Sequence, residues 1–258
     1  MSRLSDLTTT EYAELAEQAT VALIPVGANE QHGPNLGMGI DWRVAVEIAD
    51  RVAAEVAPLA VVTPPLPFGL SAHHLSFAGT LSIGADAFRA VLTDVVLSLR
   101  WHGIEKVVFV NGHRGNENVL GVLTTELAYT HGVEAASAFW MTQAADVVAA
   151  HRSTARWGHA CEVETSVALA VTPDLVRPDA LEAGDLIDDY GAFEDNYEPF
   201  AVTVPRSFRS RTRNGVFGDA RLASREAGEE IVATAVQRTA RFVREFAARP
   251  SRLPADEG

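Results

Sequence analysis

Short apolar runs alternate with amphipathic segments through the first half of the chain. Four runs, rich in β-branched or small apolar residues, predict buried strands at residues 21–26, 59–63, 106–110 and 133–139. Between them, apolar residues at helical spacing predict amphipathic helices over residues 41–57, 84–102 and 117–131. A repeated strand–helix order predicts an α/β fold, with a mostly parallel sheet covered by helices on both faces.

The hydrophobic pattern is less regular elsewhere. Helical spacing predicts helices over residues 8–19, 142–151 and 222–246, while residues 162–171 suit either a buried helix or a buried strand. Residues 173–220 combine many acids with an arginine-rich stretch and predict an irregular surface lobe, of the kind that forms an oligomer contact or a lid. No linker or repeat divides the chain, so we expect one domain over residues 1–258.

Composition narrows the classes of partner. The chain has 258 residues, with 34 acidic against 21 basic side chains and a formal net charge of -13. This balance argues against nucleic acid or an anionic membrane as the main partner, because both need a basic surface. The single cysteine, Cys161, excludes an intrachain disulfide, and no signal peptide or apolar stretch of transmembrane length is apparent. We therefore expect a cytoplasmic protein.

Metal-capable side chains gather just after the predicted strands or just before a following apolar segment. They are Glu30, His32, Asp41, His73, His74, His113, His159, Glu162 and Glu164. The carboxyl ends of parallel strands share one edge of a sheet, so we expect these groups to meet there. Mixed carboxylate and imidazole sets suit zinc, manganese or iron, and a carboxylate-rich set suits two metals bridged by an acid.

Taken singly, these residues have simpler interpretations. Asp41 suits a helix N-cap, a lone Glu-x-His occurs by chance, and Asn111 followed by glycine is a turn signal. His102 and His131 each precede a glycine at a predicted helix end, where they suit the negative end of the helix dipole. Only the shared position of the other groups at strand ends favours a metal site.

Four motifs resemble those of the creatininase family of creatinine amidohydrolases. IPVGANEQHGPNLGMGID, from residue 24, resembles P-x-G-S-x-E-Q-H-G-P-H-L-P-L-x-T-D, and GLSAHHLSFAGTLSI is similar to G-x-S-x-E-H-x-x-F-P-G-T-L-S-L. VNGHRGN is similar to N-G-H-G-G-N, and HACEVETS to H-A-G-E-x-E-T-S. The motifs follow the family's order, and GVFGDARLASREAGEEI resembles a weaker C-terminal motif.

The resemblance implies a three-layer α/β/α hydrolase, commonly a homohexamer, with two divalent metal ions at the strand ends. Carried over by position, Glu30 and His113 would bind one metal, His32 the other, and Asp41 would bridge them. His159 would be the catalytic histidine beside the metals. Zinc is the first choice, with manganese and iron as alternatives.

The chain departs from the family pattern in ways that bear on its substrate. Creatinine-cleaving members carry a metal-binding Glu two residues after the motif histidine, where this chain has Gly115. We expect Glu162 to replace it as a metal-binding and catalytic group, with Glu164 as the alternative. Ser71 and His74 are expected on the pocket wall and His73 toward solvent. Arg114 would pair either with an anionic group of the substrate or with an acid of the chain.

The expected chemistry follows from these parts. A water shared by two cations loses a proton near neutral pH, and the metal-bound hydroxide would attack an amide carbonyl. His159 would move a proton to the leaving nitrogen, unless it only orients Glu162. The expected function is a divalent-metal-dependent amidohydrolase that cleaves a non-peptide C–N bond of a small cyclic or linear amide. Gly115 disfavours creatinine itself.

Other functions compete with this prediction. Within the family they are a formamide hydrolase of a formylamino-pyrimidine intermediate and a creatininase-like peptidase. Outside it they are a non-catalytic small-molecule-binding α/β protein and a structural oligomer without turnover. The sequence contains neither a G-x-G-x-x-G nor a Walker-type loop, which weakens the binding-protein alternative.

Overall fold

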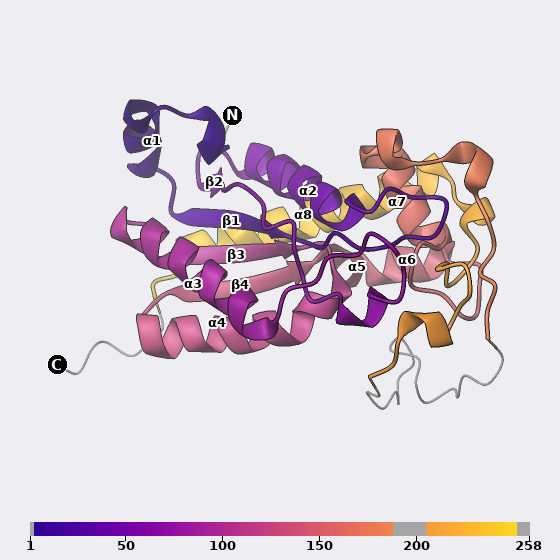
Figure 1. Ribbon diagram of the computed structural model, residues 1–258. Coiled ribbons are helices and arrows are strands. Elements are labelled where there is room, and N and C mark those ends of the chain that lie inside the picture. The colour runs from indigo at the N-terminus through magenta and orange to yellow at the C-terminus, as the bar shows by residue number, and fades with distance from the viewer. Residues whose placement is uncertain (1–2, 188–204, 252–258) are drawn as a thin grey trace.

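The computed structural model describes residues 3–187 and 205–251 (Figure 1). Within them, a four-stranded parallel sheet has the order β2-β1-β3-β4. Its strands are β1 (Val21–Val26), β2 (Ala60–Val62), β3 (Lys106–Asn111) and β4 (Glu134–Phe139). The predicted strands and the α/β class are thus confirmed, with boundaries within a residue or two.

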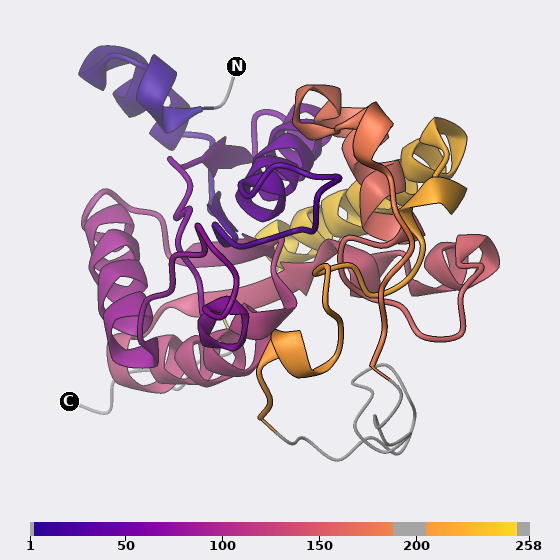
Figure 2. The same ribbon diagram turned by 45° about the vertical axis from the view of Figure 1, so that its right-hand side comes forward.

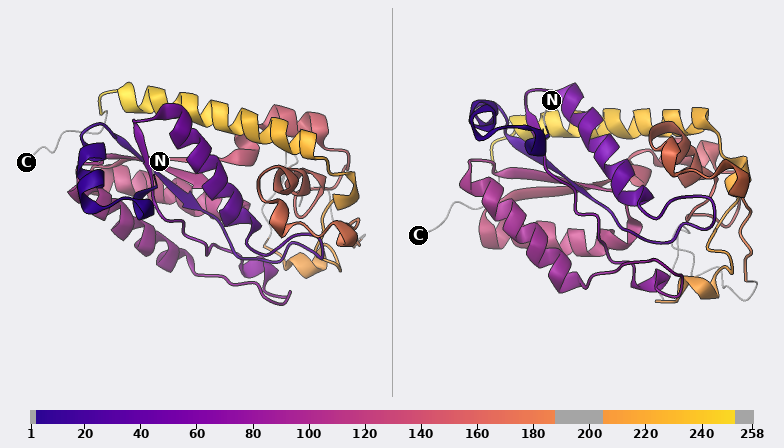
Figure 3. Two further views of the ribbon diagram at one scale, coloured as in Figure 1. Left: turned by 90° about the horizontal axis from the view of Figure 1, so that it is seen from above. Right: turned by 45° about the horizontal axis from the view of Figure 1, so that its top comes forward.

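Helices cover both faces of the sheet. In Figures 1 and 3, α2 (Ile40–Val56) and α8 (Arg225–Ala248) lie on one face, and α3 (Ala85–Trp101) and α4 (Glu117–His131) on the other. Alternate residues of β1 join opposite cores: Leu23 packs with α2 and α8, whereas Ile24 packs with α3 and α4. The continuous apolar runs of the strands are explained by this burial on both sides.

The remaining helices refine the prediction. Helix α1 (Thr9–Ala16) begins at a capping box between Thr8 and Glu11. The single helix expected over 142–151 is instead two, α5 (Trp140–Gln143) and α6 (Ala145–His151), because the backbone leaves helical geometry at Ala144. The ambiguous segment is a helix, α7 (Glu162–Val171), and it packs on α8.

The described part of residues 173–220 is irregular, as predicted. Its short 3-10 turns are η4 (Pro173–Leu175), η5 (Pro178–Ala180), η7 (Phe208–Ser210) and η8 (Ala220–Leu222), of which the last extends past the predicted lobe. Residues 188–204 of the expected lobe lie outside the described residues. The expectation of a surface lobe needs correction, because Phe208, Thr212 and Val216 are buried. They pack inward because this segment covers the loops at the carboxyl ends of the strands.

Those loops position the site. They follow β1, β2 and β3 and gather at one end of the sheet, where the 205–219 segment also lies (Figure 2). Residues Val26 of β1 and Asn111 of β3 are paired in register, so the loops that follow them leave the sheet side by side. None of the described helices has the length and apolar character needed to span a membrane.

Candidate metal centre

The loops at the carboxyl ends of β1 and β3 bring four predicted ligands together. The loop after β1 carries Glu30 and His32, the first turn of α2 carries Asp41, and the turn after β3 carries His113. All four side chains are buried, with exposed fractions of 1 to 5%. Buried acids and imidazoles at such a position need either one another or a cation to compensate their desolvation.

Asp41 lies between the two histidines. Its Oδ1 is 3.1 Å from His32 Nε2 and its Oδ2 is 3.2 Å from His113 Nδ1. Glu30 Oε1 is 3.4 Å from His113 Nδ1, and Glu164 Oε2 is 3.8 Å from His32 Nε2. The result is two groups of metal-capable side chains, Glu30–Asp41–His113 and His32–Asp41–Glu164, that share Asp41.

Several atoms of this cluster lack a hydrogen-bond partner among the described residues. They are Glu30 Oε2, His32 Nε2 and Asp41 Oδ2, each buried from solvent. The last two lie 3.1 and 3.2 Å from ion-pair partners, but these contacts lack the angles of a hydrogen bond. Buried polar atoms are nearly always partnered, so three orphans in one cluster indicate a missing ligand. Nitrogen and carboxylate oxygen donors suit zinc or manganese. The residues therefore fit a divalent metal centre.

The charges of the cluster point the same way. Burial alone lowers the pKa of His32, but the neighbouring Asp41 carboxylate overcomes it and raises that pKa to about 10. For His113, burial again lowers the pKa, but Glu30 and Asp41 together outweigh it and raise the pKa to about 9. Burial raises the pKa of Glu164 to about 7, and it also raises the pKa of Glu30. The carboxylates of Glu30, Asp41 and Glu164 thus require nearby positive charge, which bound protons or metal ions supply.

Glu162 does not face this cluster. Its Oε1 accepts hydrogen bonds from the Ser153 and Thr154 N–H groups, at 3.0 and 2.9 Å, and from the Thr154 hydroxyl at 2.7 Å. Its Oε2 accepts from the Asp219 N–H at 3.1 Å. Glu162 and Glu164 are two positions apart, and residues at this spacing lie on roughly opposite faces of a helix. Only one of them can therefore point inward. The expected assignment is corrected: Glu164, not Glu162, faces the metal-capable side chains.

His159 and His74 line the cluster from the side. His159 Nδ1 lies 3.8 Å from Glu30 Oε1 and 3.9 Å from Glu164 Oε2, and His74 Nε2 lies 3.5 Å from Glu30 Oε1. Their rings are 4.4 Å apart between centroids. Burial holds the pKa of each imidazole well below its usual range, so both are neutral at pH 7. The structure thus brings the predicted catalytic histidine and the predicted pocket-wall histidine together.

Three further predicted residues have distinct places. Ser71 is fully buried beside Glu30, whose pKa its hydroxyl lowers against the larger, raising effect of burial. His73 was expected in solvent, but its ring lies 4.2 Å from His74 and 6.0 Å from His113 because the 3-10 turn η2 (Ala72–His74) directs both histidines inward. Arg114 Nη1 lies 3.7 Å from Oε2 of Glu117, three residues further along the chain.

Sequence reasoning missed two residues of the site, Gln31 and Phe208. Gln31 contacts both His74 and His159, and Phe208 packs on the same two rings at centroid distances of 4.3 and 4.7 Å. Gln31 had a signal, since it lies between two predicted ligands. Phe208 had none, because it comes from an irregular segment far along the chain.

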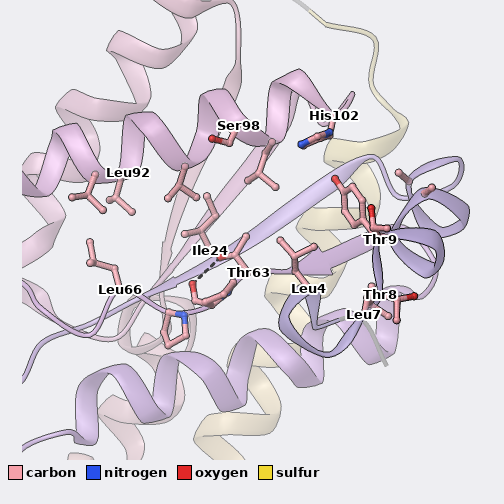
Figure 4. A pocket seen from close by; sticks show the side chains of 18 residues that line it. Leu4, Leu7, Thr8, Thr9, Ile24, Thr63, Leu66, Leu92, Ser98 and His102 are labelled. Atoms are coloured by element: carbon pink, nitrogen blue, oxygen red, sulfur yellow. Dashed lines mark hydrogen bonds between the residues drawn. The ribbon is translucent and has the colours of Figure 1, made fainter.

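A cavity of about 870 Å³ lies elsewhere, between the N-terminal segment, β1 and α3 (Figure 4). Its walls are mostly apolar, with Leu4, Ile24, Leu66 and Leu92 among them. His102, at its edge, is its one imidazole, and none of the metal-capable groups lines it. The metal-capable side chains therefore lie apart from this cavity, at the carboxyl ends of the strands.

Comparison with known proteins defines the class. The sequence model of the creatininase family, creatinine amidohydrolase, matches residues 5–243. The chain is 34% identical to the mycofactocin precursor peptide peptidase of Mycolicibacterium smegmatis over 241 residues, which covers 90% of this chain and 87% of that protein. It is 30% identical to the creatinine amidohydrolase of Pseudomonas putida over 261 residues, covering 94% and 96% of the two chains.

Solved structures agree. A crystal structure of a putative creatinine amidohydrolase from Bacteroides fragilis has a TM-score of 0.82 and 25% identity, covering 96% of this chain and 97% of that one. A creatininase structure named for Mn and a mutant creatininase of the Zn-Zn type each match with a TM-score of 0.78. The parallel sheet and its covering helices define an α/β protein with the creatininase fold. This chain belongs to the creatininase family of amidohydrolases.

Proposed function

We propose that this chain is a divalent-metal-dependent amidohydrolase with two cations bridged by Asp41. The observation that carries the proposal is the position of the Asp41 carboxylate between His32 and His113, beside buried atoms that lack partners among the described residues. Glu30 and His113 would hold one cation with Asp41, and His32 and Glu164 the other. Two bound cations lower the pKa of a shared water and polarise the amide carbonyl. Zinc is the first choice, with manganese or iron also suited to this donor set.

His159 is the proton carrier in this proposal. Its imidazole is neutral because burial lowers its pKa, and its Nδ1 faces Glu30 and Glu164. Nδ1 takes a proton from the attacking water and delivers it to the leaving nitrogen, which cannot depart as an anion. Ser71 and His74 form the wall against which the amide is held, and Arg114 stays a candidate for an anionic substrate group.

The proposed substrate is a small cyclic or linear amide with a non-peptide C–N bond, such as the formamide of a formylamino-pyrimidine. Creatinine is disfavoured because Gly115 replaces the Glu of creatinine-cleaving relatives. A side chain there has no room: a Cβ on Gly115 would lie 2.6 Å from the Leu70 carbonyl oxygen and would also collide with His113.

A second candidate is cleavage of a peptide bond in a precursor peptide. It is favoured by the 34% identity to a mycofactocin precursor peptide peptidase over 90% of this chain. The two reactions differ in the size of the leaving group, and the same centre would serve both.

The test is a panel assay with the zinc-loaded protein. Creatinine, a formylamino-pyrimidine and a mycofactocin precursor peptide would be incubated with it, and products followed by mass spectrometry before and after chelation by EDTA. We expect cleavage of one of the last two, loss with EDTA and recovery on adding zinc. Cleavage that survives complete removal of metal would contradict the proposal.

We propose a homohexamer, supported by Trp101 and Tyr129, which are 87% and 75% exposed on α3 and α4. Light scattering after size-exclusion chromatography tests it, and a mass other than that of six chains would contradict it. A cytoplasmic location stays a prediction, supported by the single cysteine and the acidic composition.

A further inference from the structure

Gln31 joins the two histidines of the site to each other. Its side-chain Nε2 lies 2.9 Å from His74 Nδ1, and its main-chain oxygen lies 2.7 Å from His159 Nε2. The side chain is 6% exposed and lies between the predicted ligands Glu30 and His32 in sequence. The same Nε2 also lies 3.0 Å from His159 Nε2, so this one residue contacts both imidazoles.

The orientation of the Gln31 amide is set by its other partners. Oε1 accepts a hydrogen bond from the Gly33 N–H at 2.9 Å, and Nε2 donates to the Gly215 carbonyl at 3.3 Å. Gly215 has φ +87°, and a Cβ at this position would collide with Gln31 Oε1. Only a glycine at position 215 therefore leaves room for the Gln31 side chain. The NH₂ group is thereby directed at His74.

This orientation determines which nitrogen of His74 carries the proton. An amide NH₂ donates and cannot accept, so His74 Nδ1 must be the acceptor of its hydrogen bond. The proton of the imidazole is then on Nε2, 3.5 Å from Glu30 Oε1. A protonated Nε2 has no lone pair for a metal, although Glu30, His73 and His74 together have the spacing of a metal-capable group.

His159 presents a lone pair to the acidic side chains, whereas His74 presents an N–H group to them. The two hydrogens of the Gln31 amide are taken by His74 Nδ1 and the Gly215 carbonyl, so the 3.0 Å contact of Gln31 Nε2 with His159 Nε2 is not a hydrogen bond. A carbonyl oxygen only accepts, so His159 Nε2 carries a proton and donates it to the Gln31 oxygen at 2.7 Å. The lone pair of His159 is on Nδ1, which faces Glu30 and Glu164. Phe208 packs on both rings, which restricts their rotation.

We infer that Gln31 is a positioning residue that gives the two histidines opposite roles, with His74 as a hydrogen-bond donor through Nε2 and His159 as a proton acceptor through Nδ1. The roles in catalysis rest on the proposed function. His74 would donate to the amide oxygen as negative charge develops on it, and His159 would accept the proton of the attacking water.

Ring ¹⁵N NMR of the zinc-loaded protein tests the inference, because correlations of Nδ1 and Nε2 with the ring protons distinguish the two tautomers. His74→Gln and His159→Gln variants assign the signals. In the wild type we expect both rings protonated on Nε2. Gln31→Glu replaces the donor by a carboxylate acceptor, so His74 should change to the Nδ1-protonated form while His159 keeps its form. Gln237→Glu, on the exposed face of α8, is the matched control and should change neither.

Three results would overturn the inference: a wild-type His74 protonated on Nδ1, a His74 unchanged in Gln31→Glu, or both rings changed together as after a general loss of structure. If Gln31→Glu does not fold, the wild-type spectrum alone decides. The measurement needs no turnover. A protein that cleaves no amide yet shows the expected tautomers would overturn the proposed function and leave the assignment by Gln31 standing.

Discussion

The carboxylate of Glu164 lies against the imidazole of His32, with Oε2 3.8 Å from Nε2. The Ala160 N–H donates to the same oxygen at 2.6 Å, from a residue with φ 49°. Few non-glycine residues adopt such a conformation, and it places the start of α7 so that Glu164 reaches the cluster. The chain has Gly115 two residues after His113, and α7 brings the carboxylate of Glu164 to the metal-capable group of His32 and Asp41 instead.

This contact predicts different results for the two glutamates. Glu164→Gln removes a charge from the His32–Asp41–Glu164 group, so we expect bound metal to fall by about half and activity by about 100-fold or more. Glu162→Gln should keep the metal but weaken the hydrogen bonds to Ser153, Thr154 and Asp219, at about 1–3 kcal/mol of unfolding free energy. Elemental analysis and urea unfolding measure the two effects. Metal loss in Glu162→Gln alone would reverse the assignment.

Removing the imidazole of His159 should slow catalysis without releasing metal. For His159→Gln we expect kcat to fall about 10²–10⁴-fold, the usual contribution of a proton-transfer group, with KM little changed. Steady-state kinetics and metal content would be measured on the same preparation. If metal is lost in proportion to activity, His159 is a ligand rather than a proton carrier.

Metal affinity should rise with pH. In the metal-free protein the neighbouring carboxylates raise the pKa of His113 to about 9 and that of His32 to about 10, against the opposing effect of burial. At pH 7 both rings hold protons that a cation must displace, whereas near pH 10 His113 has lost most of its proton and His32 about half. Calorimetry at pH 7 in buffers of different ionisation enthalpy should detect two or more protons released per chain on zinc loading, because Glu164, with a pKa of about 7, also releases protons. Binding with no proton release would contradict these assignments.

The same shifts predict the stability of the metal-free protein. Groups with raised pKa stabilise the fold while protonated, so the contributions of His32 and His113 are complete below about pH 6.5. They are lost as pH rises through about 9 and 10. Urea unfolding of metal-free protein from pH 6 to 10 should show this decline, and zinc should abolish most of it. A stability that rises across this range would contradict the charge assignment.

Gly115 should tolerate no side chain. A Cβ there would lie 2.6 Å from the Leu70 carbonyl oxygen, so Gly115→Ala must displace this loop or His113. We expect a loss of about 1–3 kcal/mol in unfolding free energy and weaker metal binding. The matched control is Gly121→Ala in α4, where a Cβ meets nothing within 4 Å, and there helix propensity predicts a gain of about 0.5–1 kcal/mol. Equal effects at the two positions would contradict this account of the loop.

Sequence alone predicted the sheet because burial on both faces leaves continuous apolar runs such as that of β1. It also placed Glu30, His32, Asp41 and His113 at one edge, because the carboxyl ends of parallel strands coincide. It favoured Glu162 over Glu164. The direction of each side chain at the start of α7 depends on the backbone conformation of Ala160, which the sequence does not reveal. Phe208 could not be predicted, because its approach depends on the path of an irregular segment.

Metal content tests the proposed two-cation centre most directly. Elemental mass spectrometry would be applied to the purified wild type and to Asp41→Asn after incubation with zinc and manganese. We predict about two divalent ions per wild-type chain and loss of most of them in Asp41→Asn, because Asp41 belongs to both groups of ligands. A folded wild-type protein that binds no divalent ion, or an Asp41→Asn variant that keeps its full complement, would contradict it.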